Sequence, residues 1–216
     1  MYFILGSSIE DVGDYPQHQT MGDRYDYDGK CSVYNLLRDF EFTPNFSGAK
    51  IERKAKRTDL ISSVPIPCNC LIFNDNLKNL LGQFKMPPHR LFQLPLKHKW
   101  RTYSYWCLQI VEPEDIFSYL DFSETNFFVK SFDTNKRQKI NVANEQELCE
   151  LKRTLSSDQD LYNTSYRFKE GYLGRYDLFT NGFLDIDIYI SESLRNALDS
   201  SSFSGVSIGK SRLLKW

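Results

Sequence analysis

Ile188–Leu198, with the sequence IYISESLRNAL, is the stretch that decides the fold. Its first three residues belong to the segment 186–190, Ile-Asp-Ile-Tyr-Ile, which predicts a strand. Ser191 is a favoured helix N-cap, and Leu194 and Leu198 follow with the spacing of one apolar helix face. The segment therefore predicts a strand that passes directly into a short amphipathic helix.

The same strand-to-helix order occurs earlier in the chain. Leu71–Leu81 aligns with Ile188–Leu198 without a gap at an offset of 117 residues, and Lys78-Asn79 aligns with Arg195-Asn196. Asn74 stands at the N-cap position of this earlier copy. A solenoid needs three or more copies, so a single repeat does not indicate one. The sequence instead predicts two weakly related strand–helix–strand units in one protein.

The segments around these two units complete the expected fold. An aspartate followed by apolar residues precedes each copy, at Asp59–Ser62 and at Asp177–Thr180. Further strands are expected over residues 1–10, 70–73, 90–94, 103–111, 127–129 and 203–208, and a helix over residues 145–155. We expect an α+β fold with a substantial mixed or antiparallel sheet and short helices. The expected lobes are residues 1–100 and residues 101–216, with one continuous domain as the alternative.

The region between the first strand and the first copy is less regular. Residues 11–30 are rich in Asp, Gly and Tyr and lack periodicity, which predicts a loop or a ligand-facing surface. Residues 32–42 are expected to form a short element, and residues 43–50 a turn.

Composition indicates a folded protein with a buried core. Of the 216 residues, 41% are apolar and 25% are charged. Aromatic residues reach 15%, which suits either an aromatic core or a recognition surface. No apolar stretch approaches the roughly 18 residues of a membrane span. Met1–Leu5 is too short for a signal peptide, so we expect a cytoplasmic protein without a membrane partner.

The five cysteines do not suggest a disulfide framework or a zinc site. Their number is odd and their spacing is irregular. No second Cys or His pair stands at zinc-binding distance from Cys68 and Cys70. We expect reduced thiols and no metal.

Charge is close to balanced overall but segregated along the chain. Residues 51–110 hold 10 Lys and Arg against 3 Asp and Glu, whereas residues 111–200 hold 10 against 17. This segregation favours either attraction between two parts of the protein or a surface field that steers a charged partner.

Two segments resemble known ligand-binding motifs but lack the spacing or the residues that those motifs require. Gly205–Ser211 resembles a phosphate loop, but it has three residues between its glycines where four are needed, and too little chain follows for the required helix. Asp26–Gly29 resembles part of a calcium loop, but Arg24 and Asn35 would stand where carboxylate oxygens are needed. We therefore expect no cofactor.

Carboxylates that could serve a hydrolase gather near the second copy, at Asp177, Asp185 and Asp187. In the expected strand, Asp185 and Asp187 share one face and Ile186 and Ile188 the other. This is the ordinary alternation of a half-solvated strand, and it favours a structural role. A hydrolase or transferase whose site is assembled from distant carboxylates is the alternative.

A mixture of basic and aromatic residues occurs at Lys97–Arg101, with Tyr103 and Tyr105 beyond it. Such mixing suits nucleic-acid backbones and stacked bases, and it gives a nucleic-acid-binding protein as a second alternative. A pI near 6.3 disfavours that alternative.

Several ordered segments resemble one known family. They are Tyr2–Leu5, Thr58–Ile61, Cys70–Leu77, Tyr103–Val111, Leu120–Glu124, Asp177–Phe179, Ile188–Leu194 and Phe203–Val206. Together they resemble the bacterial polymorphic-toxin immunity proteins, in particular the large group first described in myxobacteria and formerly known only as a domain of unknown function. The most specific parts are the Ile-Ser-Glu-x-Leu segment and the terminal Gly-Val, and residues 101–216 form the immunity-like lobe.

The resemblance implies a non-catalytic cytoplasmic protein that binds a cognate toxin domain and blocks it stoichiometrically. It supplies no catalytic, metal-binding or cofactor-binding residues. If the toxin is a basic nuclease, the acidic region 111–200 could occupy its substrate site. Asp177, Asp185, Asp187 and Tyr189 are the partner contacts predicted on that basis.

Overall fold

The computed structural model describes residues 1–10, 12–13, 18–20, 31, 43–63, 66, 69–111, 115–172, 174–181, 184–211 and 213–215. Its strands are β1 (Tyr2–Ser7), β2 (His18–Thr20), β3 (Lys50–Ile51), β4 (Leu60–Ile61), β5 (Cys70–Phe73), β6 (His89–His98), β7 (Arg101–Ile110), β8 (Asn126–Ser131), β9 (Arg137–Ile140), β10 (Gln159–Arg167), β11 (Leu178–Thr180), β12 (Ile188–Ser191), β13 (Val206–Lys210) and β14 (Leu214–Lys215). Its helices are α1 (Asp75–Leu81), α2 (Ile116–Tyr119), α3 (Glu145–Thr154) and α4 (Glu192–Ser201). The fold is α+β with short helices, as predicted.

The two predicted units build two arrays with the same strand order. The first half-sheet, β4-β5-β7-β6, is part of a six-stranded sheet that β3 and β2 extend. The second array, β11-β12-β1-β13, is a complete four-stranded sheet, and we call it the second half-sheet because it matches the first strand by strand. All neighbours within both half-sheets are antiparallel. The N-terminal strand β1 therefore takes the place in the second half-sheet that β7 takes in the first.

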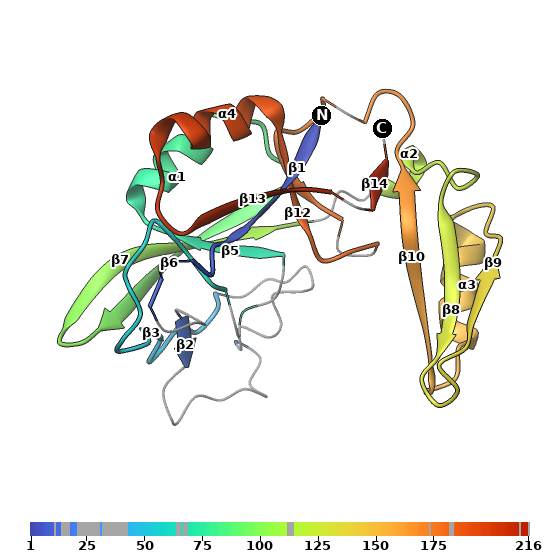
Figure 1. Ribbon diagram of the computed structural model, residues 1–216, viewed down its shortest axis with the longest axis horizontal. Helices are drawn as coiled ribbons and strands as arrows, with labels where there is room; N and C mark the ends of the chain where they lie inside the picture. The colour runs from blue at the N-terminus through green and yellow to red at the C-terminus, as the bar shows by residue number, and fades with distance from the viewer. Residues whose placement is uncertain are drawn as a thin grey trace.

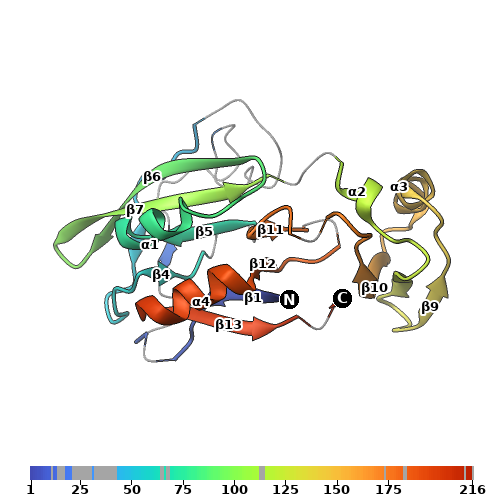
Figure 2. The same ribbon diagram turned by 90° about the horizontal axis from the view of Figure 1, so that it is seen from above.

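Each half-sheet passes into a helix through the N-cap predicted from sequence. The side chain of Asn74 accepts a hydrogen bond from the Leu77 N–H at 3.1 Å, and Ser191 accepts one from Leu194 at 3.2 Å. These bonds satisfy donors that the first helical turn leaves free. Figures 1 and 2 show α1 and α4 lying on the same side of the strands.

The apolar faces of both helices and both half-sheets share one core. Equivalent side chains of the two repeats meet there, with Leu71 and Phe73 of β5 matched by Ile188 and Ile190 of β12. The other members are Phe3, Leu5, Leu60, Leu77, Leu81, Leu108, Ile110, Leu178, Leu194 and Leu198. Burial of this shared face supplies the main stabilisation of the pair, because neither short helix is stable alone.

A third sheet, β14-β10-β8-β9, forms a separate lobe with α2 and α3, seen at the right of Figure 1. Its core joins the outer face of the second half-sheet and is dominated by aromatic rings. The buried aromatics are Tyr2, Phe127, Tyr166, Phe168, Tyr172, Phe179 and Tyr189. Much of the aromatic content of the chain thus lies in this core.

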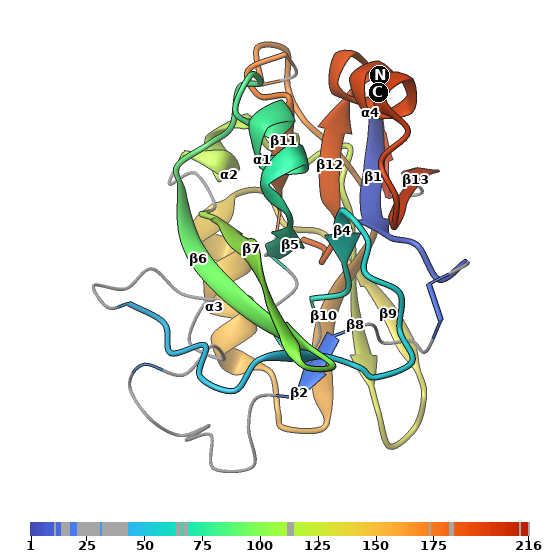
Figure 3. The same ribbon diagram turned by 90° about the vertical axis from the view of Figure 1, so that its left-hand side faces the viewer.

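The long β6–β7 hairpin lies at the opposite end of the molecule from this lobe (Figures 1 and 2) and points toward the viewer in Figure 3. Its strands pair at ten positions, from His89 with Ile110 to His98 with Arg101. The expected lobe boundary between residues 100 and 101 falls at this turn, and β1 pairs with strands of the C-terminal half. The division into residues 1–100 and 101–216 stays a prediction.

Several expected segments differ in detail or lie outside the described residues. The strand expected over residues 186–190 begins only at Ile188. Within the loop expected over residues 11–30, His18–Thr20 forms β2. Most of the rest of that loop, including Asp26–Gly29, and the element expected over residues 32–42 lie outside the described residues. The phosphate-loop-like segment contains strand β13, which pairs with β1.

Candidate functional site

Three of the four predicted partner contacts gather around one carboxyl group. The hydroxyls of Tyr166 and Tyr189 each donate to Oδ2 of Asp185 at 2.6 Å, and the Asp187 N–H donates to its Oδ1 at 2.9 Å. Tyr166 lies on β10 and Tyr189 on β12, so the cluster joins the third sheet to the second half-sheet.

The expected alternation around Asp185 is wrong. Ile186 is 70% exposed, whereas Asp185 and Asp187 are half-buried and Tyr189 is fully buried. The reason is the pair of tyrosine hydroxyls, which turns Asp185 inward as their acceptor. Burial raises the pKa of Asp185 above its ordinary value, although the tyrosine hydrogen bonds oppose that rise. The most exposed side chain at this place is therefore Ile186. Partner contact through Asp177, Asp185, Asp187 and Tyr189 stays a prediction.

Asp177 belongs to a different network, at the start of the second repeat. Its Oδ1 accepts from the hydroxyls of Ser191 at 2.7 Å and Ser193 at 3.0 Å. Its Oδ2 accepts from the Lys85 N–H at 3.0 Å. Burial raises the pKa of Asp177, but these hydrogen bonds outweigh it and leave the pKa below its ordinary value.

Asp59 is the counterpart of Asp177 in the first repeat. One oxygen accepts from Asn74 Nδ2 at 2.6 Å, and the other accepts from the N–H of Ser204 at 2.8 Å and from its hydroxyl. Lys85 follows α1 and Ser204 follows α4, so each aspartate binds the loop after the other repeat's helix. The two repeats therefore hold each other through reciprocal bonds.

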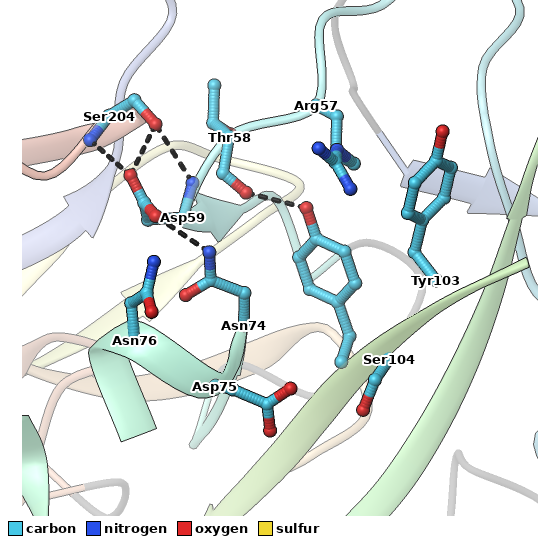
Figure 4. Close-up of a pocket in the computed structure, with 10 residues that line it drawn as sticks. Arg57, Thr58, Asp59, Asn74, Asp75, Asn76, Tyr103, Ser104 and Ser204 are labelled. Carbon is cyan, nitrogen blue, oxygen red and sulfur yellow. Dashed lines mark hydrogen bonds between the residues drawn. The ribbon is translucent and has the colours of Figure 1, made fainter. Parts of the chain in front are cut away.

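Asp59 also lines a pocket of about 420 Å³, drawn in Figure 4. Its other lining residues are Arg57, Thr58, Asn74, Asp75, Asn76, Tyr103, Ser104, Tyr105 and Ser204. The Tyr105 hydroxyl donates to the Thr58 carbonyl at 2.6 Å, and Asp75 accepts from Trp106 Nε1 at 2.6 Å. Both carboxylates of the pocket thus hold neighbouring elements in place.

The second hollow lies at the tip of the β6–β7 hairpin and measures about 390 Å³. We call it the tip hollow; its lining residues are Arg57, His98, Lys99, Trp100, Arg101 and Tyr103. Arg57 and Tyr103 also line the Asp59 pocket, so the two hollows adjoin. The Arg57 guanidinium lies 4.0 Å from the centre of the Tyr103 ring, a cation–π contact that orients it.

Two further features of the tip hollow are unusual. Trp100 is 84% exposed, the highest exposure among the large apolar side chains that the structure describes. His98 is 9% exposed, and its Nε2 has no hydrogen-bond partner within the described part of the chain. A buried polar nitrogen without a partner is costly and calls for an explanation.

The remaining chemistry of the described residues is limited. Within the described ranges, no group of three or more His, Cys, Asp or Glu side chains could hold a metal ion. Cys31, Cys70, Cys107 and Cys149 are free thiols. None of the described helices is long and apolar enough to cross a membrane. The ion pairs Arg167–Glu124, Arg175–Asp115 and Arg195–Asp199 all join residues within the acidic region 111–200.

Sequence reasoning found part of these sites. The basic and aromatic run at Lys97–Arg101, singled out as a possible nucleic-acid-binding segment, forms the hairpin tip. The contribution of Arg57 was missed, because it comes from a separate segment that no local pattern links to the hairpin. The equivalence of Asp59 and Asp177 was visible in the sequence, but their hydrogen bonds to Ser204 and Lys85 of the opposite repeat were not.

No protein-family model matches the chain, and no curated protein matches it.

Proposed function

We propose that this protein is a non-catalytic immunity protein, which binds a cognate bacterial toxin domain in the cytoplasm and blocks it by stoichiometric binding. The observation that carries the proposal is the exposed Trp100 on a protruding hairpin, beside Arg57 and Arg101. Tryptophan and arginine are the side chains most often found at the centre of protein–protein interfaces. An indole that is 84% exposed at the end of a long hairpin is well placed to be buried by a partner.

The choice of a toxin as the partner rests on the family resemblance of the repeat segments. The fold is consistent with this choice, since the most specific parts of that resemblance have structural roles here. Ser191 caps α4 and binds Asp177, and Gly205 fits closely against Leu60. Such segments would leave the exposed hairpin free to vary with the partner.

The hydrolase or transferase alternative would use carboxylates that the fold already engages. Asp59 and Asp177 accept hydrogen bonds from the opposite repeat, and Asp185 accepts from two tyrosines. A hydroxyl or N–H that occupies each oxygen competes with a substrate or a catalytic water for the same lone pairs. This arrangement favours binding over catalysis.

Co-expression tests the proposal. The gene directly upstream should encode a secreted protein with a toxic C-terminal domain, and expression of that domain alone should stop growth of the host. Co-expression of this protein should restore growth, and the purified pair should form a complex of fixed stoichiometry by light scattering. Rescue at far less than one equivalent, or no rescue from the upstream domain, would reject the proposal; an unrelated toxin serves as the control.

A further inference from the structure

We propose that the tip of the β6–β7 hairpin is the surface that holds the partner, and that the tip hollow receives an acidic side chain of that partner protein beneath Trp100. The inference rests on the proposed function and adds to it the place of contact and the chemistry of the partner. It stands on three observations: the lining of the hollow, the unpartnered His98 nitrogen and the exposed indole.

The lining of the tip hollow suits a carboxylate. It consists of two arginines, a lysine, a histidine and two aromatic rings. The Arg57 guanidinium is already oriented by the Tyr103 ring at 4.0 Å, so less side-chain freedom is lost when it binds an anion. A planar guanidinium matches the two oxygens of a carboxylate in a bidentate pair. Arg101, exposed on the neighbouring strand, adds a second guanidinium to the same hollow.

The His98 imidazole gives independent support. His98 lines the hollow, and its buried Nε2 has no hydrogen-bond partner among the residues that the structure describes. A small rotation of the imidazole that turns this N–H toward a ligand oxygen in the hollow would supply a hydrogen bond that no described residue provides. Binding of an acidic side chain therefore removes an unpaired group as well as neutralising cations.

The hairpin turn presents the indole and the cations together. Lys99 adopts the left-handed backbone conformation, with φ of 56°, which lysine rarely takes. Glycine or asparagine would fit this turn with less strain. The sequence instead has a lysine there, followed by the exposed Trp100. The turn therefore places a cation and an exposed indole next to each other at the tip.

The charges next to the hollow favour a protein over a nucleic acid. Through Arg57 and Tyr103 the tip hollow adjoins the Asp59 pocket, which also presents the exposed carboxylate of Asp75. A phosphate backbone that ran from one hollow to the next would meet these carboxylates. A protein surface can complement both the positive and the negative charges, with an acidic group in the tip hollow and a basic or polar group in the Asp59 pocket.

The test measures binding of the toxic domain encoded upstream to the full-length protein and to four variants. Trp100→Ala and Arg101→Glu alter the tip. Phe132→Ala and Lys136→Glu are matched controls on the β8–β9 hairpin, where Phe132 is 57% exposed and Lys136 is also exposed. All four side chains lie on the surface, and thermal unfolding checks that each variant folds. The same proteins are tested against a single-stranded oligonucleotide of about 20 nucleotides at low salt.

We expect Trp100→Ala to weaken binding of the toxic domain by about 30-fold or more, as truncation of a central interface tryptophan does. We expect Arg101→Glu to weaken it by about 10-fold and to flatten its dependence on salt, while both controls stay within about 2-fold. Equal affinities for tip and control variants would overturn the inference and leave the proposed function standing. Failure of the wild-type protein to bind the toxic domain would overturn both, and binding of the oligonucleotide that is lost only in the tip variants would show a nucleic-acid surface instead.

Discussion

Gly205 shows how one residue fixes the contact between the two repeats. Its φ is +75°, a conformation that favours glycine. A Cβ at this position would collide with the Leu60 carbonyl oxygen and lie 2.5 Å from Oγ1 of Thr58. The loop after α4 therefore approaches β4 at a distance that a side chain would prevent, and this approach places Ser204 against Asp59.

Gly205→Ala should lower the free energy of unfolding by about 2–4 kcal/mol, because the added methyl combines a strained backbone with a clash against rigid backbone atoms. Gly171→Ala is the matched control, since Gly171 has φ of +97° and nothing within 4 Å of its would-be Cβ. That control should lose only about 1 kcal/mol, the cost of the backbone conformation alone. Urea unfolding of both variants measures the difference, and equal losses would show that the close approach is unimportant.

Single residues also mark the limit of what the sequence revealed about the site. The exposure of Trp100 could be anticipated, because it stands among cations in a chain segment between two strands. The unpaired nitrogen of His98 could not, because hydrogen-bond satisfaction depends on groups that are distant in sequence. The inward turn of Asp185 was likewise hidden, since Tyr166 comes from another sheet.

At the scale of elements, the reciprocal bonds of Asp59 and Asp177 join each repeat to the loop that follows the other repeat's helix. The Lys85 carbonyl accepts from Asp177 N at 2.7 Å, and the Ser204 carbonyl accepts from Asp59 N at 3.1 Å. A second pair of contacts follows the same symmetry. Lys78 lies over the Trp106 ring at 3.4 Å, and its repeat counterpart Arg195 lies over Phe3 at 4.4 Å.

Asp59→Ala and Asp177→Ala should each destabilise the protein by about 2–4 kcal/mol at neutral pH, because each leaves several donors without their charged acceptor. The pKa of both carboxyls lies below the ordinary value in the folded state. Their contribution is therefore present above the unfolded pKa of about 4 and is lost as the pH falls through the folded pKa. Denaturation at several pH values should show both variants approaching the wild type in acid.

Asp199→Ala is the control for these two variants. Asp199 pairs with Arg195 within α4 at 3.3 Å on the surface, so its loss should change stability by less than about 0.5 kcal/mol. A loss for Asp59→Ala or Asp177→Ala as small as that of the control would contradict the reciprocal arrangement.

Elements with a strong local pattern were predictable. The helix expected over residues 145–155 is α3. The two strand–helix–strand units, each with its N-cap residue, correctly predicted α1 and α4. Strand β10 was missed, because its inward positions include Asn163 and Ser165, so it lacks apolar alternation. Its place comes from pairing with β8, which a single-sequence pattern does not contain. Strands of two residues, such as β3, are too short to carry a pattern at all.

At the scale of the whole molecule, Asp185 links the third sheet to the rest of the protein. Its two tyrosine donors come from β10 and β12, and Tyr166 and Tyr189 are themselves fully buried. Burial is the larger cause, and the negative charge of Asp185 the next, of a raised pKa for Tyr189. Its hydroxyl therefore stays protonated and able to donate.

Asp185→Asn should leave stability unchanged or raise it at neutral pH, because an amide oxygen still accepts a hydrogen bond while the buried charge is removed. Asp185→Leu should cost about 2–5 kcal/mol, since it leaves two buried hydroxyls unpaired. The raised folded pKa of Asp185 predicts that its charge penalises the wild type above that pKa and that the penalty disappears as the pH falls through it. Urea denaturation of the wild type and of Asp185→Asn, from neutral to acid pH, measures how this penalty changes with pH. A wild type that is more stable than Asp185→Asn at neutral pH would contradict the prediction.

The central place of β1 in the second half-sheet has a consequence for how the protein is made. β1 is synthesised long before the strands beside it, because Phe3 pairs with Ile190 on one side and with Lys210 on the other. Pairing between residues so far apart in sequence slows folding, and this apolar strand has no partners until residues 188–210 have been synthesised. The nascent protein therefore exposes an apolar strand during its synthesis, and it is vulnerable to aggregation in that interval.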